Sequence, residues 1–227
     1  MKIKAVLFDI DNTLFNTQVM AANSRRNAVK AMIEAGFDVD LGEALSVLSK
    51  IVRKYGPNYD NHYDRLLEEY GLAPNHRVIA AGIVAYHTTK IAYLVPYSDT
   101  IPTLLQLREN KIKLGVVSDG LAVKQWEKLI RLGLQHFFQA VVVSEDLGVS
   151  KPDGVLFSRA VEMLSLKPTQ VLMVGDRLGK DIYGANKAGL VSVQILHEGS
   201  SKRKPKNQFE YPDYVIEKIG EILEILV

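Results

Sequence analysis

Residues 3–15 read I-K-A-V-L-F-D-I-D-N-T-L-F, a mostly apolar run that ends in two aspartates and an Asn-Thr pair. A continuous apolar run of this length is typical of a strand buried on both faces, as in a parallel sheet. Asp9 and Asp11 follow directly, so we expect them at the carboxyl end of that strand. Because ligands of open α/β sheets bind beyond the carboxyl ends of the strands, this stretch indicates both a fold and the place of a site.

Four further apolar runs follow later in the chain, at residues 114–117, 140–143, 171–174 and 191–195. Helical patterns lie between them. In residues 122–132 the apolar side chains Val123, Trp126 and Ile130 fall on one face, and Pro152 opens another helical pattern. Strands that alternate with helices predict an α/β fold with a doubly wound, Rossmann-like parallel sheet.

The stretch from residue 16 to residue 95 interrupts this alternation. It reads as several helices separated by turn residues, among them Gly36 and Pro74. A chain of 227 residues can hold one core with an inserted subdomain. We therefore expect an α/β core made of residues 1–15 and 96–227, with residues 16–95 inserted as an α-helical cap subdomain.

The composition is that of an ordinary globular protein, with 47% hydrophobic and 24% charged residues. The 28 basic and 26 acidic side chains give a net charge of +2, which does not favour a nucleic-acid partner. No stretch approaches the ~20 apolar residues of a membrane span, so no membrane partner is expected. The chain has no cysteine, which excludes disulfides and thiolate nucleophiles. We expect a soluble cytoplasmic protein that is a monomer or a small homo-oligomer.

Polar residues follow four of the predicted strands. Because the carboxyl ends of parallel strands meet at one edge of the sheet, we expect these side chains to lie close together. They are Asp9 and Asp11 in F-D-I-D-N-T-L, Ser118 and Asp119 in V-V-S-D-G, Lys151 in S-K-P-D, and Asp176 and Asp181 in V-G-D-R-L-G-K-D.

In this order the motifs resemble those of the haloacid-dehalogenase-like hydrolases: D-I-D-N-T, a Ser after an apolar strand, K-P, and G-D with a later Asp. The resemblance covers residues 1–15 and about 96–195, and the helical insert is similar to the family's small helical cap in placement, length and helicity. It implies a Mg²⁺-dependent phosphatase that acts on a small phosphorylated metabolite. The pattern is also similar to archaeal members assigned to sugar or triose phosphates, with glyceraldehyde 3-phosphate as a candidate.

The resemblance implies catalytic and metal-binding roles at the first and last motifs. Asp9 would attack phosphorus and form an aspartyl-phosphate. Asp11 would protonate the leaving alkoxide and then deprotonate the hydrolytic water. Mg²⁺ would be held by Asp9, Asp176 and the backbone carbonyl of Asp11. Thr13 could hydrogen-bond the nucleophile or satisfy the turn, and the sequence does not separate these roles.

The same resemblance implies a phosphate-binding set between those motifs. Ser118 would donate its hydroxyl, and Asp119 and Gly120 their backbone N–H groups, to phosphate oxygens. Lys151 would add a positive charge against the charge of the transition state. Asp181 could hold a metal-bound water or fix Lys151, or it could be a carboxylate placed near the start of a helix.

Three other functions use the same fold. A 2-haloacid dehalogenase would not need an acid at position 11, because a halide leaves without a proton. A phosphotransferase or mutase would share the motifs and differ in the acceptor of the phosphoryl group. A non-catalytic binding protein should have lost at least one of the motif residues, and all of them are present.

Overall fold

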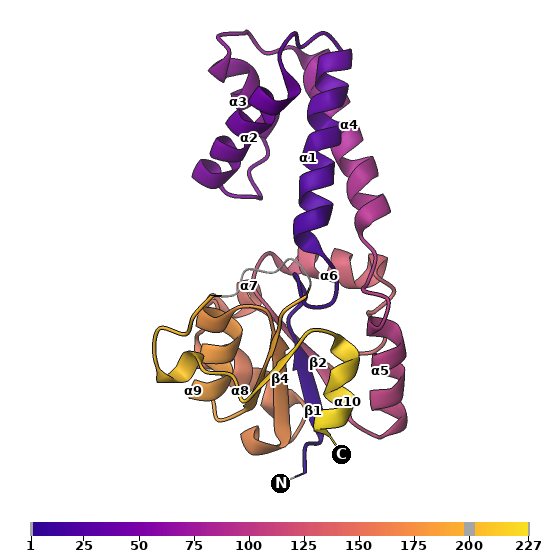
Figure 1. Ribbon diagram of the computed structural model, residues 1–227, viewed down its shortest axis with the longest axis vertical. Helices are drawn as coiled ribbons and strands as arrows, with labels where there is room; N and C mark the ends of the chain where they lie inside the picture. Colours follow the sequence, from indigo (N-terminus) through magenta and orange to yellow (C-terminus); the bar gives the residue numbers. More distant parts are fainter. Residues whose placement is uncertain (1, 198–202, 227) are drawn as a thin grey trace. The chain divides into compact units, whose positions relative to one another are not determined.

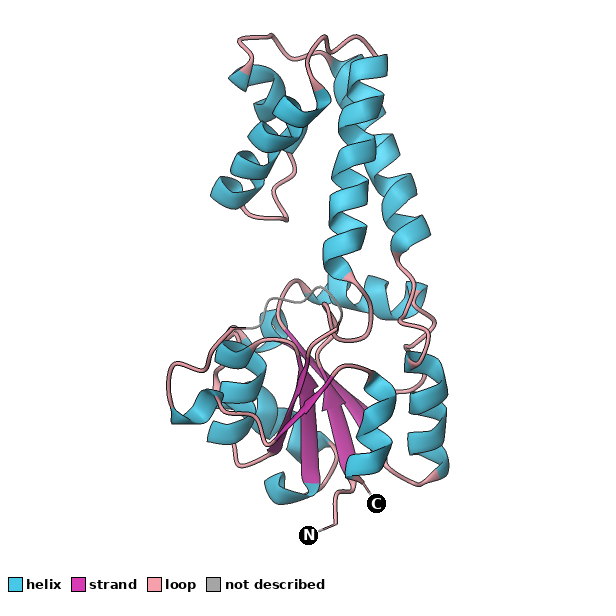
Figure 2. Cartoon of the chain, viewed as in Figure 1, coloured by secondary structure: helices cyan, strands magenta, loops and turns pink. Residues whose placement is uncertain are grey.

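The computed structural model describes residues 2–197 and 203–226. The chain divides into two units, one made of residues 1–16 and 94–227 and the other of residues 17–93 (Figure 1). The first unit contains the strands, and the second is helical (Figure 2). The chain therefore leaves the first unit after its first strand and returns to it about 80 residues later.

Within the described residues, the first unit is built on a six-stranded sheet in the order β3-β2-β1-β4-β5-β6, and each neighbouring pair is parallel. Strand β1 is central, because Phe8 pairs with Val116 of β2 on one side and with Val174 of β4 on the other. This arrangement confirms the predicted α/β fold with a parallel sheet. The bounds are β1 Ala5–Phe8, β2 Lys113–Ser118, β3 Ala140–Val143, β4 Val171–Gly175, β5 Val191–Ile195 and β6 Tyr214–Ile216.

The five predicted apolar runs all coincide with strands, and β6 is the strand that the pattern did not predict. It has three residues, of which Tyr214 and Val215 are exposed and only Ile216 is buried. An edge strand of this length carries no continuous apolar run. Periodicity alone therefore could not separate it from a loop.

Helices cover both faces of the sheet. Figure 1 shows α8 and α9 on one side and α5 and α10 on the other. On the first side, Leu156 and Phe157 of α8 belong to a buried cluster with Leu7 and Val117 of the central strands. The bounds are α5 Thr100–Glu109, α6 Ala122–Arg131, α7 Ser144–Leu147, α8 Gly154–Met163, α9 Tyr183–Lys187 and α10 Ile222–Ile225, with a π-helical turn at Leu178–Ile182.

Helix α6 forms where the sequence predicts it, but its apolar stripe is exposed. Val123 is 80% exposed, and Trp126 and Ile130 are exposed as well. The residues that α6 buries are Gln125 and Leu129. A polar side chain therefore occupies an inward position of this helix, and it takes part in the site described below.

The second unit has a hydrophobic core of its own, formed by its four helices. Phe37, Leu48, Leu66 and Val78 belong to a single buried cluster in this unit. Asp40 caps the second helix by accepting a hydrogen bond from the backbone N–H of Glu43 over 2.8 Å. The bounds are α1 Thr17–Glu34, α2 Leu41–Tyr55, α3 His62–Glu69 and α4 His76–Tyr93.

The two longest helices of this unit, α1 and α4, pack against each other along their length (Figure 1). Gly82 permits the close approach, because a Cβ at this position would lie 2.8 Å from Cγ of Met32. Neither of these helices, nor any other in the described part of the chain, combines the length and the apolar character needed to cross a membrane.

Candidate active site

The carboxyl ends of the central strands bring the predicted residues to one edge of the sheet. Asp9 follows β1, Ser118 is the last residue of β2 and Asp176 follows β4. Because β1 lies between β2 and β4 and the three run parallel, these side chains leave neighbouring strands at the same edge. Lys151 lies in the loop between α7 and α8, and Asp181 lies in the π-helical turn after β4.

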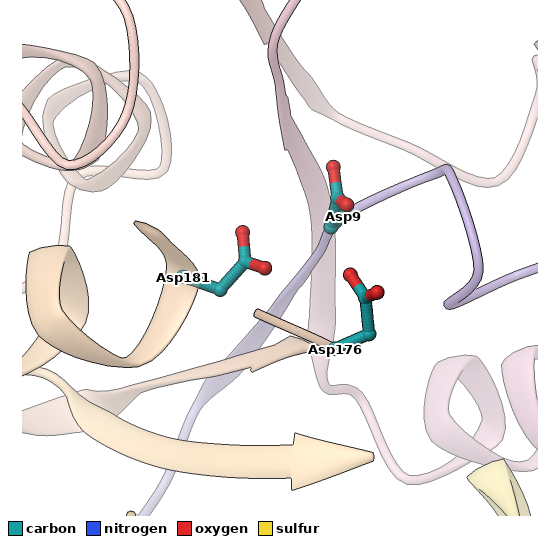
Figure 3. A group of neighbouring side chains, drawn as sticks. All are labelled: Asp9, Asp176 and Asp181. Carbon is teal, nitrogen blue, oxygen red and sulfur yellow. The ribbon is translucent and has the colours of Figure 1, made fainter. Parts of the chain in front are cut away.

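Three carboxylates converge at this edge. Oxygen atoms of Asp9, Asp176 and Asp181 lie within 4.8 Å of one another, on side chains from two strand ends and one helical turn (Figure 3). Oδ1 of Asp176 is buried and has no hydrogen-bond partner in the part of the chain that the structure describes. Carboxylate oxygens are the hard donors that divalent cations such as Mg²⁺ prefer. The cluster therefore fits a divalent metal ion.

Burial raises the pKa of two of these carboxyl groups. It raises the pKa of Asp9 from 3.8 to about 6, an effect that Lys151 opposes and that Asp181 strengthens. It raises the pKa of Asp176 from 3.8 to about 7, with Asp181 and Asp9 adding repulsion and Arg177 and Lys151 opposing it. A cation bound between the carboxylates would favour the ionised form of both.

Lys151 supplies the positive charge inside this cluster. Its Nζ donates to Oδ1 of Asp9 over 2.8 Å, to Oδ1 of Asp181 over 2.6 Å and to the carbonyl oxygen of Val117 over 3.1 Å. The residue is 4% exposed, so all three of its donors are used within the protein. Burial lowers the pKa of Lys151, but the attraction of Asp181 and Asp9 outweighs it and raises the pKa above its usual range.

Asp181 has both carboxylate oxygens engaged by the protein. Oδ1 accepts from Lys151, and Oδ2 accepts from the backbone N–H of Arg177 over 3.0 Å. Gly175 makes room for this side chain, because a Cβ at position 175 would collide with the carboxyl group of Asp181. The contact with Lys151 is one of the roles that the sequence left open for Asp181, and it explains the glycine of the V-G-D motif.

The loop after β2 is held by residues that no motif contains. The Ser118 hydroxyl donates to Oε1 of Gln125 over 3.4 Å, and Nε2 of Gln125 donates to the carbonyl oxygen of Asp119 over 3.0 Å. The backbone N–H of Gly120 donates to Oγ of Ser144 over 2.8 Å. The expected contact of this N–H with a phosphate oxygen stays a prediction, and it would replace the hydrogen bond to Ser144.

The Asp119 side chain connects this loop with two others. Oδ1 accepts from the backbone N–H of Lys151 over 2.8 Å, and Oδ2 accepts from Nζ of Lys180 over 2.5 Å. The sequence predicted a role only for the backbone N–H of Asp119. The side-chain contacts were missed because their partners lie 32 and 61 residues away, where no local pattern reveals them.

The Asp11 side chain lies outside the acidic cluster and contacts α6. Nζ of Lys128 donates to Oδ1 and to Oδ2 of Asp11, each over 2.7 Å, and to Oε1 of Gln125 over 3.2 Å. Neither Lys128 nor Gln125 was identified from the sequence. The signal for them was weak: two polar residues three positions apart lie on the same face of a helix, opposite its apolar stripe.

Thr13 is completely buried in the loop that follows Asp9. Its Oγ1 has no hydrogen-bond partner among the described residues. Its carbonyl oxygen lies 3.2 Å from Nε2 of His197, whose ring stacks on Tyr97 with 3.7 Å between the ring centroids. A buried hydroxyl without a hydrogen-bond partner is uncommon in proteins.

Comparison with known proteins extends this picture. The model of the haloacid dehalogenase-like hydrolase family matches residues 6–195. A glyceraldehyde 3-phosphate phosphatase of Methanopyrus kandleri is 50% identical over 226 residues, which are 99% of this chain and 97% of the relative. A protein of the same name from Methanocaldococcus jannaschii is 42% identical, again over 99% of this chain and 97% of the relative.

Solved structures show the same architecture. A HAD phosphatase from Thermococcus onnurineus superposes with a TM-score of 0.67 at 28% sequence identity, and the match covers 100% of this chain and 98% of that one. The similarity therefore includes the helical unit as well as the sheet.

Proposed function

The chain belongs to the haloacid dehalogenase-like hydrolase family, and on that basis we propose that it is a Mg²⁺-dependent phosphatase that hydrolyses a small phosphomonoester through Asp9. The observation that carries the proposal is the placement of Asp9. Its carboxylate lies beside the buried Lys151 and within the cluster that Asp176 and Asp181 complete. A nucleophilic carboxylate, a fixed positive charge and metal donors are the groups that phosphoryl transfer needs.

In this proposal Mg²⁺ is held by Asp9, Asp176 and the backbone carbonyl of Asp11. The unpaired Oδ1 of Asp176 supports the choice, because a bound cation would satisfy it. Asp181 stays with Lys151, since both of its oxygens already accept hydrogen bonds. When bound, the ion neutralises phosphate charge and favours the ionised form of the carboxylates.

The first chemical step transfers the phosphoryl group from substrate to protein. Ser118 and the backbone N–H of Asp119 hold phosphate oxygens while an oxygen of Asp9 attacks phosphorus. The bond between phosphorus and the alcohol oxygen breaks, and Asp11 gives that oxygen a proton. Lys151 opposes the charge that builds up around phosphorus. The products are the free alcohol and an aspartyl-phosphate at Asp9.

The second step returns Asp9 to its starting state. Asp11, now ionised, removes a proton from a water molecule that attacks phosphorus. The bond between Asp9 and phosphorus breaks, and inorganic phosphate leaves. Asp11 thus acts first as an acid and then as a base, and it is ready for another cycle when the second step ends.

The proposed substrate is glyceraldehyde 3-phosphate. Its support is the identity of 50% and 42% to two relatives that carry the name glyceraldehyde 3-phosphate phosphatase and match almost the whole chain. At 50% identity the helical unit is included in the match as well as the motifs. Side chains that hydrogen-bond to the aldehyde and hydroxyl groups would distinguish this substrate from other phosphomonoesters.

The proposal is tested by measuring phosphate release from a panel of small phosphomonoesters, each with Mg²⁺ and with EDTA, beside chloride release from 2-chloropropionate. We expect phosphate release that needs Mg²⁺ and is fastest with glyceraldehyde 3-phosphate, and no chloride. Chloride release without metal would replace the phosphatase by a dehalogenase. Metal-dependent release that favours a different ester would retain the reaction and change the substrate.

A further inference from the structure

Helix α6 directs two polar side chains toward the site from consecutive turns. Gln125 is 4% exposed, and Nζ of Lys128 lies 2.7 Å from both carboxylate oxygens of Asp11. The two residues are joined to each other by a hydrogen bond of 3.2 Å between Nζ of Lys128 and Oε1 of Gln125. Neither belongs to the motifs that define the family resemblance.

The contact between Lys128 and Asp11 fixes the orientation of a carboxylate and not merely its position. A single ammonium group that donates to both oxygens restrains rotation of the carboxylate about its last bond. Lys128 also donates to Gln125, so the three acceptor atoms of the ammonium belong to two side chains. The ring of Phe15, whose centroid lies 6.0 Å from Nζ, flanks the same ammonium.

Gln125 extends this network to the phosphate-binding loop. Its Oε1 accepts from the Ser118 hydroxyl, and its Nε2 donates to the carbonyl oxygen of Asp119. Gly120 leaves the space that the amide occupies, because a Cβ there would lie 2.6 Å from Nε2 of Gln125. The two residues on α6 therefore connect the loop after β2 with the acid and base of the loop after β1.

We propose that Lys128 is a positioning residue for Asp11, and that Gln125 aligns it with Ser118. The inference rests on the proposed function, in which Asp11 exchanges protons with the leaving group and with water. Without Lys128 the Asp11 side chain, which is 32% exposed, would lose the two hydrogen bonds that set the orientation of its carboxylate. Proton transfer requires the donor and acceptor atoms to lie within hydrogen-bond reach. Removing Lys128 should therefore slow the steps in which Asp11 gives or takes a proton.

The test compares two esters that differ in their need for an acid. The alkoxide of glyceraldehyde 3-phosphate needs a proton to leave, whereas the nitrophenolate of p-nitrophenyl phosphate does not. In the Lys128→Met variant we expect kcat/KM for the alkyl ester to fall about tenfold or more, part of the ~10²- to 10⁴-fold that general acid catalysis supplies. For the aryl ester kcat/KM should fall less than about threefold, because this constant reports the steps up to departure of the alcohol.

Three further variants separate positioning from stability. Lys128→Arg should recover part of the loss, because a guanidinium can also donate to both oxygens of a carboxylate. Lys124→Met changes an exposed lysine one turn earlier on the same helix and should leave both constants unchanged. Lys128→Met placed on an Asp11→Asn background should cause no further loss, because the residue that it positions is already disabled.

Phosphate release by the wild type tests the proposed function by itself. The ratio of kcat/KM for the alkyl ester to kcat/KM for the aryl ester, measured in the variants, tests the role of Lys128. An equal fall for both esters, or a further fall on the Asp11→Asn background, would overturn the inference. Unchanged constants in Lys128→Met would overturn it as well. Thermal unfolding curves of Lys128→Met and Lys128→Arg that match the wild type ensure that the comparison is made on folded protein.

Discussion

Lys151 donates a hydrogen bond from Nζ to Oδ1 of Asp9 over 2.8 Å, and both residues are almost completely buried. The chain separates them by 142 residues. An ion pair in such a position costs desolvation of both charges, which the protein offsets with the additional contacts of Lys151 to Asp181 and Val117. The arrangement holds the proposed nucleophile in one place before any substrate binds.

Asp9→Asn should abolish phosphate release while leaving the fold intact. The amide keeps the size of the side chain but is not a nucleophile that can form an aspartyl-phosphate. Because burial already disfavours the charge on Asp9, the amide should not lower the temperature of unfolding by more than a few degrees. Phosphate assays and thermal unfolding measure the two effects. Asp146→Asn, at an exposed position of α7, serves as the control, and near-wild-type hydrolysis by Asp9→Asn would disprove the assignment.

Lys151→Met should lower both stability and activity. It removes the charge that pairs with Asp9 and Asp181 and leaves two buried carboxylates without it, a change that typically costs about 3–5 kcal/mol. Urea unfolding in EDTA gives the free energy of unfolding, and phosphate release gives the activity. The exposed Lys204→Met should alter neither. Stability equal to that of the wild type would show that the carboxylates do not need this ammonium.

Asp119→Ala and Asp119→Asn should differ in activity. The amide retains an oxygen that can accept from the backbone N–H of Lys151, whereas alanine loses both contacts. A misplaced Lys151 loop should lower kcat/KM by up to about 10²-fold in the alanine variant, and less in the asparagine variant. Lys180→Met breaks only the partly exposed ion pair and should cost about 0–1 kcal/mol of stability. Equal activity of the two Asp119 variants would contradict this account.

Binding of Mg²⁺ should weaken as the pH falls. The pKa values of about 6 for Asp9 and about 7 for Asp176 mean that protons occupy these carboxylates in mildly acidic solution when no metal is bound. Each proton that the metal must displace lowers the apparent affinity by up to about tenfold per pH unit. Titration calorimetry between pH 5.5 and 8, in buffers of different ionisation enthalpy, measures the affinity and the protons released. A constant affinity over this range would refute the prediction.

Asp9 and Asp176 also make the free energy of unfolding depend on pH. The direction is opposite to that of a salt-bridged acid, whose pKa is lowered by folding. Because their pKa values are higher in the folded protein than in the unfolded chain, the folded state binds more protons between about pH 4 and pH 7. Their contribution to the free energy of unfolding therefore falls as the pH rises through this window. Added Mg²⁺ should reverse the fall at neutral pH, which unfolding curves with and without the metal would detect.

The sequence predicted the sheet well because its strands are apolar on both faces. All five predicted apolar runs form strands. The polar residue that follows the run in each of the central strands β2, β1 and β4 lies at the same edge of the sheet. The pattern failed where burial depends on tertiary partners. On α6 the apolar Val123 is exposed and the polar Gln125 is buried, which is the reverse of what periodicity predicts.

The missed site residues share one cause. Lys128 contacts a residue 117 positions away, and Lys180 one 61 positions away, so neither contact leaves a local signature. Gly175 carried a signal that could have been used. A glycine directly before a predicted metal-binding aspartate indicates a close approach by another group, which here is the carboxyl group of Asp181.

The strand order has a consequence for synthesis on the ribosome. β1 is synthesised before both of its neighbours, which begin at Lys113 and Val171, so more than 100 residues are added after the central strand before it can pair. During that interval an apolar segment stays exposed and prone to aggregation. Residues 17–93, which emerge next, form a hydrophobic cluster of their own. The insertion therefore lets the nascent chain bury apolar side chains while the strand that carries Asp9 still lacks its partners.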